Sequence, residues 1–193
     1  MSRTKEFDTE EVLDKAITLF WDKGYNACSI QDVVDGLGLS RSSIYETFGD
    51  KRQLFLAALK KYQVAGMDAL RREMENSTDI RQSITRLFES ILPCNLKDPL
   101  QKGCFMVNTG IELAPHDPEI AELITKNRRE TEETLAAAIR RGQENGQLST
   151  RQDPMSVARY IYVNLSGLRV TSSSGVFDTE AMEQIIRVAL SVL

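Results

Sequence analysis

Apolar residues recur every three or four positions along most of the chain, which is the period of an amphipathic helix. The clearest stripes lie in residues 8–23 and 51–75, and the alternating pattern of strands is almost absent. All five prolines fall outside the strongest stripes, where a proline would break an internal helical hydrogen bond. The pattern therefore predicts an all-α fold.

Capping residues divide this pattern into separate helices. Ser29, with Asp32 three residues later, forms a variant of the capping box, so a short helix is expected to follow it. Ser40 is placed to cap a second short helix, and Asp50 a longer one over 51–75. Further helices are expected at 79–92, 104–113, 118–145, 153–171 and 178–193.

The two short helices are joined by the sequence GLGL, which is typical of a helix-turn-helix. Gly38 suits the tight turn, and Leu37 and Leu39 are apolar anchors beside it. In such a pair, the N-terminal residues of the second helix reach base edges in the major groove of DNA. Hydroxyls, basic side chains and one tyrosine are the candidate DNA-binding residues: Arg3, Lys5, Ser29, Ser40, Arg41, Ser42, Ser43, Tyr45 and Lys51.

These candidates have different expected roles. Arg41 suits a bidentate contact with guanine, whereas Tyr45 and Lys51 suit phosphate contacts. Glu46 lies on the same helix, where an acid either repels phosphate or selects cytosine, and the sequence leaves its direction open.

The chain has a net charge of −4, and residues 1–60 carry eight basic and ten acidic side chains. Any DNA-binding surface is therefore local, with few phosphate contacts and a modest salt dependence.

The segment from Asp8 to Leu59 resembles the DNA-binding domain of the TetR family of transcriptional regulators. The matching positions are Leu19-Phe20, Gly24-Tyr25, Ser29-Ile30, Val33, Gly38-Leu39-Ser40, Ile44-Tyr45, Phe48, Lys51 and Leu54. The resemblance implies a helix-turn-helix domain over 1–52, joined through the fourth helix to a helical ligand-binding and dimerisation domain over 53–193. It also implies a non-enzymatic regulator, most simply a repressor that binds palindromic operator DNA as a homodimer and is released by a small-molecule effector.

The last two helices are the expected dimer interface. Each carries an apolar stripe, formed by Ala158, Ile161, Leu165 and Leu168 in one and by Met182, Ile186, Ala189 and Leu193 in the other. Four such helices from two subunits form a bundle, although the same stripes also suit the core of a single chain.

By resemblance, an effector pocket lies between the DNA-binding domain and the last two helices. Polar groups within an apolar shell are suited to orient a small ligand there. The candidate ligand-binding residues are Phe88, Cys104, Phe105, Asn108, Glu112, Tyr160 and Asn164. No charged cluster indicates an ionic ligand, so the effector is expected to be largely apolar. The mixed charges of KNRRETEE, at 126–133, are interpreted as a solvated helix face.

The three cysteines, Cys28, Cys94 and Cys104, form no CxxC pair, and His116 is the only histidine. This argues against a disulfide framework, a metal site and a bound cofactor. Cys104 follows Lys102 at an expected helix N-terminus, and both features lower a thiol pKa. A thiol-based redox-sensing regulator, with Cys94 as the resolving thiol, is therefore the alternative function, and a buried structural Cys104 is the competing interpretation.

Two other functional classes remain as alternatives. A thiol peroxidase using Cys104 lacks a neighbouring histidine, and a ligand-binding protein that has lost DNA binding is motivated by Glu46 and the acidic N-terminal domain. There is no apolar run near 18 residues and no signal segment, so the expectation is a cytoplasmic protein without a membrane span.

Overall fold

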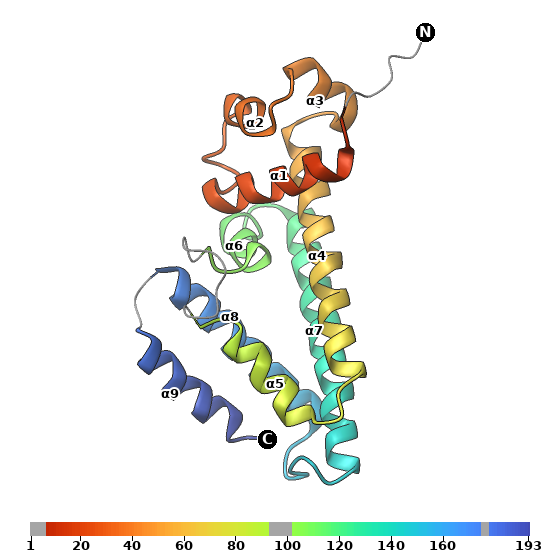
Figure 1. Ribbon diagram of the computed structural model, residues 1–193, viewed down its shortest axis with the longest axis vertical. Coiled ribbons are helices and arrows are strands. Elements are labelled where there is room, and N and C mark those ends of the chain that lie inside the picture. The colour runs from red at the N-terminus through yellow and green to blue at the C-terminus, as the bar shows by residue number, and fades with distance from the viewer. Residues whose placement is uncertain (1–6, 93–101, 175–177) are drawn as a thin grey trace. The chain divides into compact units, whose positions relative to one another are not determined.

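The structure is a computed structural model that describes residues 7–92, 102–174 and 178–193. Helices connected by turns and short loops make up these residues, and no strand occurs among them (Figure 1). The predicted all-α fold is therefore confirmed. The helices are α1 (Thr9–Lys23), α2 (Ile30–Leu37), α3 (Arg41–Phe48), α4 (Lys51–Glu75), α5 (Ile80–Glu89), α6 (Phe105–Glu112), α7 (Pro118–Glu144), α8 (Pro154–Ser174) and α9 (Thr179–Leu190).

The capping residues expected from the sequence are confirmed at several helices. Ser29 and Asp32 form the reciprocal capping box of α2, and the Ser40 hydroxyl accepts a hydrogen bond from the Ser43 amide. Asp50 accepts one from the Gln53 amide at 2.7 Å. These side chains satisfy backbone N–H groups that have no partner within their helix, so the helix starts are determined locally.

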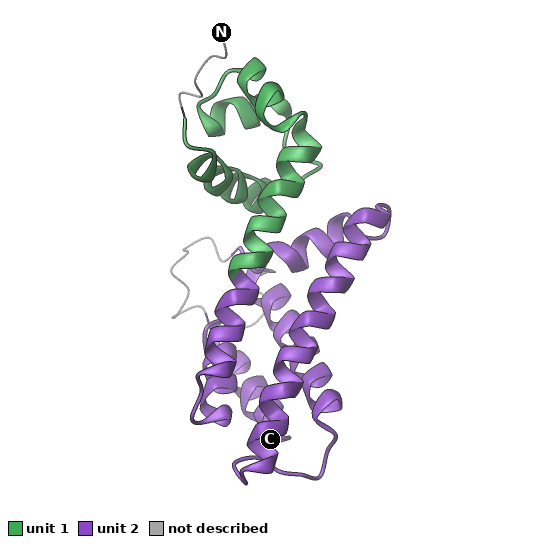
Figure 2. Ribbon diagram, turned by 90° about the vertical axis from the view of Figure 1, so that its right-hand side faces the viewer, with its two compact units in different colours: residues 1–65 green, residues 66–193 purple. Residues whose placement is uncertain are grey.

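The chain forms two compact units, unit 1 (residues 1–65) and unit 2 (residues 66–193), which Figure 2 shows in different colours. The boundary lies within α4, further along the same helix than the domain boundary expected after residue 52. The reason is that the first half of α4 belongs to the core of unit 1. Phe55 packs edge-to-face on Phe20, with ring centres 5.2 Å apart, and both side chains are fully buried.

Unit 2 has its main core between α5, α7, α8 and α9. The apolar stripes of α8 and α9 that were expected to form a dimer interface lie in this core, because α8 packs along α7 and α9 packs on α5 and α8. The residues concerned are Ala158, Ile161, Leu165, Leu168, Met182, Ile186, Ala189 and Leu193. These two stripes stabilise the fold of the single chain and are not available to a second subunit.

None of the helices in the described ranges has a stretch that is both long and apolar enough to cross a lipid bilayer.

Candidate DNA-binding surface and effector region

Helix α3 in unit 1 is short, polar and held by one apolar anchor. Ile44 is 0% exposed, whereas Arg41, Ser42 and Tyr45 are exposed on the same helix. Burial of Ile44 fixes the rotation of α3 about its axis, so its polar side chains face outward. Glu46 is also exposed, which places a negative charge on this surface.

The turn between α2 and α3 has the conformation that the glycine predicts. Gly38 has a φ of 67° in the left-handed region, and its amide donates to the Val34 carbonyl at 3.0 Å. A residue with a side chain is strained in this conformation. Leu37, directly before the turn, is buried. The predicted helix-turn-helix is therefore present (Figure 1).

The N-terminus of α3 carries a cluster of hydroxyls. The Ser40 hydroxyl accepts from the Ser43 amide at 3.1 Å and lies 3.0 Å from the Ser42 hydroxyl and 2.8 Å from the Ser43 hydroxyl. The Arg41 guanidinium lies 5.9 Å from the centre of the ring of Tyr45, one turn further along α3, within the range of a cation–π contact. Hydroxyls and one guanidinium thus share the exposed start of the helix.

Two further predicted DNA-binding residues have contacts within unit 1. The Ser29 hydroxyl donates to Asp32 at 2.6 Å as part of the α2 cap. The Lys51 ammonium donates to the carbonyl of Tyr25 at 2.7 Å and to that of Cys28, and lies 4.2 Å from the centre of the Tyr25 ring. Lys51 therefore holds the α1–α2 connection, and its phosphate contact stays a prediction. Arg3 and Lys5 lie outside the described residues.

An ion pair joins the end of α1 to α2. The Lys23 ammonium donates a hydrogen bond to the Asp32 carboxylate and, together with bonds from Ser29, holds the pKa of Asp32 well below its usual range. The same bond raises the pKa of Lys23. Cys28, beside this contact, is fully buried, and burial raises the pKa of its thiol. Cys28 therefore packs as a small side chain in the core of unit 1.

Helix α6 brings together four of the predicted ligand-binding residues. Cys104 and Phe105 are buried, and the Asn108 amide donates to the Lys102 carbonyl at 2.9 Å. Glu112 is half-buried one turn further on. The helix packs against α7 and α8 in unit 2. Phe88, another candidate, is buried in the core between α5, α7, α8 and α9.

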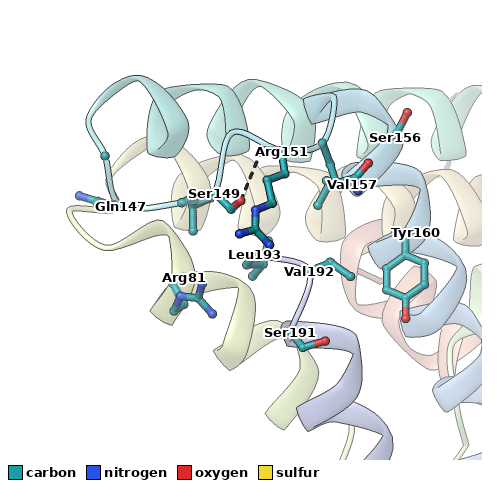
Figure 3. A pocket seen from close by; sticks show the side chains of 13 residues that line it. Arg81, Gln147, Ser149, Arg151, Ser156, Val157, Tyr160, Ser191, Val192 and Leu193 are labelled. Carbon is teal, nitrogen blue, oxygen red and sulfur yellow. Dashed lines mark hydrogen bonds between the residues drawn. The ribbon is translucent and has the colours of Figure 1, made fainter.

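The two candidates on α8 lie apart from this group. The Asn164 side chain donates to the Tyr160 carbonyl at 2.8 Å, and the Tyr160 ring is 40% exposed. Tyr160 lines a separate cavity between α8, the α7–α8 connection and the residues that follow α9 (Figure 3). The sequence shows that these side chains are on one helix but not which of its faces meets α6.

Sequence reasoning missed Tyr162, which lies on another face of α8. Burial raises the pKa of Tyr162, and the nearby Cys104 thiol adds to the rise. Tyr162 therefore lies beside the start of α6, where the effector region was expected. Two tyrosines two positions apart are equivalent in the sequence pattern, and only the packing of α8 distinguishes them.

The charged segment 126–133 was interpreted as a solvated face, and this is wrong for Glu132. Its side chain is buried, with the residue 5% exposed, and it forms ion pairs with Arg128 at 2.6 Å and with Arg159 of α8 at 3.6 Å. A buried carboxylate requires such partners to offset its desolvation. Glu132 therefore links α7 to α8 rather than facing solvent.

The relationship of this chain to known proteins is decided by two family models. The model for bacterial regulatory proteins of the tetR family matches residues 12–58, and the model for the tetracyclin repressor-like C-terminal domain matches residues 80–189, more than half of the chain. The chain belongs to the TetR family. Consistent with this family, it is a DNA-binding transcriptional regulator and not an enzyme.

Individual TetR relatives match over almost the whole length. The chain is 35% identical to an uncharacterised HTH-type transcriptional regulator, YezE of Bacillus subtilis, with 100% of both chains covered. It is 27% identical to the HTH-type transcriptional repressor ComR of Escherichia coli, covering 99% of this chain and 90% of ComR. A solved structure of a CifR cysteine mutant with 26-bp operator DNA has a TM-score of 0.84 at 24% identity, with 98% of both chains covered, and shares the fold.

Proposed function

We propose that this protein is a repressor that binds palindromic operator DNA as a homodimer, reads bases with the start of α3, and is released by a small-molecule effector. The observation that carries the proposal is the exposed N-terminus of α3, held in place by the buried Ile44. ComR, a relative over nearly the whole chain, is a repressor, which supports the sign of regulation. The proposal places the protein with its DNA in the cytoplasm.

The dimer in this proposal uses exposed faces of α8 and α9. Tyr160, Val163 and Val170 are 40%, 65% and 37% exposed and share one face of α8, and Val188 of α9 is 64% exposed. Exposed large apolar side chains of this kind favour burial against a second subunit. Two subunits related by a two-fold axis would present two copies of α3 to half-sites about 34 Å apart.

The effector in this proposal binds near α6. Asn108 and Glu112 supply polar groups beside the buried Phe105, which suits a largely apolar molecule oriented by a few hydrogen bonds. Release requires the effector to bind the free protein more tightly than the operator-bound protein, because only a differential affinity shifts the equilibrium.

A thiol-based release through Cys104 is the second candidate, favoured by the position of Cys104 between Gly103 and α6 and beside Tyr162. Cys104 is buried, and Cys94 lies outside the described residues. Treatment with diamide separates the two candidates. If Cys104 is the sensor, diamide releases the wild type from DNA but not Cys104→Ser. A reversible effector site leaves both proteins bound.

The test of the repressor proposal is fluorescence anisotropy of the purified protein on duplex DNA from upstream of its own gene. We expect selective binding with two subunits per site. Arg41→Ala should weaken that binding by about 1–3 kcal/mol and relax the preference for one base. Arg129→Ala, which removes an exposed arginine of α7, is the matched control and should leave binding unchanged. An equal loss on all sequences would contradict base reading by Arg41.

A further inference from the structure

A cavity of about 800 Å³ lies in unit 2, between the start of α5, the α7–α8 connection, the first turns of α8 and the residues that follow α9. Figure 3 shows Arg81 from α5 and Arg151 from the connection beside Leu193, with Val157 and Tyr160 of α8 on another side. None of the described residues that line it belongs to α6. It is therefore a different site from the proposed effector region.

The charged side chains among the described residues that line this cavity are all positive. Arg81 and Arg151 line it, and no aspartate or glutamate side chain is among its described lining residues. One Arg81 N–H donates to the Leu190 carbonyl at a long 3.4 Å, and neither guanidinium forms an ion pair with a described residue. Guanidinium groups pair with carboxylates through two parallel hydrogen bonds, so these two side chains are suited to hold an anionic group.

The rest of the wall combines apolar side chains with polar ones, and hydrogen bonds fix its backbone. Leu148 and Val157 are buried side chains at its surface. The Gln147 side chain donates to the Thr78 carbonyl at 2.8 Å and accepts from the Ile80 amide at 3.2 Å, which ties the α7–α8 connection to the start of α5. A cavity formed before binding costs less ordering entropy when a ligand enters.

The same connection is fixed on its other side. The Ser149 amide donates to the main-chain oxygen of Leu193 at 2.9 Å. The Gln143 side chain donates to the carbonyls of Ser149 and Gln152 at 2.8 and 2.9 Å. The segment that carries Arg151 is thus held at both ends, and its guanidinium starts from a defined backbone position.

We propose that this cavity binds a small amphipathic carboxylate, with the carboxylate on Arg81 and Arg151 and the apolar body against Leu148 and Val157. Two cations beside the apolar side chains of Leu148 and Val157 favour an anion that also has a hydrophobic part. This is a second ligand site in addition to the proposed effector region, and it does not depend on operator binding.

The test is isothermal titration calorimetry of the full chain, without DNA, with three probes that share one alkyl chain: octanoate, octanamide and octylammonium. We expect octanoate to bind at one site per subunit, and the neutral and cationic probes to bind at least about tenfold more weakly. Arg81→Gln and Arg151→Gln should each weaken octanoate binding about tenfold or more, because each removes a charged donor pair. Arg129→Gln is the matched control, since Arg129 is exposed on α7 and does not line the cavity.

The arginines are exposed, so the variants should unfold at the same temperature as the wild type, which thermal unfolding checks in parallel. Equal affinity for octanoate and octanamide would overturn the proposal. So would octanoate binding that is unchanged in both Arg81→Gln and Arg151→Gln, because the anion would then bind elsewhere. Absence of octanoate binding up to millimolar concentration would also overturn it.

Discussion

Replacement of Lys51 by methionine separates two roles for this residue that sequence reasoning did not distinguish. Lys51 was expected to contact DNA phosphate, but its ammonium donates to the carbonyls of Tyr25 and Cys28 in unit 1. Lys51→Met retains the unbranched apolar stem and removes the charge and the donors. If the contacts within the protein matter, the variant loses stability in the absence of DNA.

The size of this loss follows from the contacts. A hydrogen bond to a charged group contributes about 1.5–3 kcal/mol, and Lys51 makes two of them. The ammonium also lies 4.2 Å from the Tyr25 ring centre, a cation–π contact of about 0.5–1 kcal/mol. Contacts that share one group are not additive, and the site is only partly buried, so we expect unit 1 to lose about 2–4 kcal/mol of its free energy of unfolding.

The assay is urea denaturation followed by tryptophan fluorescence. Trp21 is the only tryptophan and packs on Tyr62 in unit 1, with ring centres 5.1 Å apart, so its emission reports on that unit. Lys60→Met is the matched control, because Lys60 is exposed on the same helix and should change the midpoint little. The reasoning is refuted if Lys51→Met unfolds at the wild-type urea concentration while its DNA affinity falls evenly across sequences.

Three further changes test other parts of the fold. Gly38→Ala should lower the free energy of unfolding by about 1 kcal/mol in the same urea assay. The loss comes from the backbone, because φ is +67° and the added methyl group meets no atom within 4 Å. An unchanged urea midpoint would contradict this. Asp32→Asn should reduce the loss of stability on acidification. Because the pKa of Asp32 is lowered in the folded protein, its pair with Lys23 stabilises fully above about pH 4, and this stabilisation is lost as the pH falls further. Urea midpoints of the wild type and the variant from pH 6 to 3 would show the difference. Val163→Glu should convert the dimer to a monomer in analytical sedimentation. The control Val64→Glu introduces the same charge at a 59% exposed valine of unit 1 and should leave the dimer intact. A dimer in both variants would reject the α8 face as the interface.

The helix-turn-helix was predictable because its signals are local. Ser29, Ser40 and Gly38 act on backbone groups within a few residues of themselves, so their roles can be inferred from spacing alone. The starts of α4 and α7 follow from Asp50 and Asp117 for the same reason. Element ends and caps therefore needed no knowledge of how the helices pack.

The sequence predicted correctly that effector-region residues lie together only where they share α6. Cys104, Phe105, Asn108 and Glu112 lie within three turns, so the helix itself brings them together. Tyr160 was added from another helix, and there the packing of α8 decided the outcome by placing Tyr162 near Cys104 instead. A rotation of α8 by about half a turn would place Tyr160 where Tyr162 now lies. The spacing of apolar residues does not show which of the two tyrosines faces α6.

By itself, the sequence determined the all-α fold, the helix-turn-helix and the family, because periodicity, caps and a glycine turn depend on neighbours along the chain. Only the tertiary structure decided that the apolar stripes of α8 and α9 form the chain's own core and that Glu132 is buried between two arginines. It also decided that Lys51 faces two carbonyls. The physical reason is that burial and ion pairing depend on residues far apart in sequence, and a helical pattern does not specify which partner each face will meet.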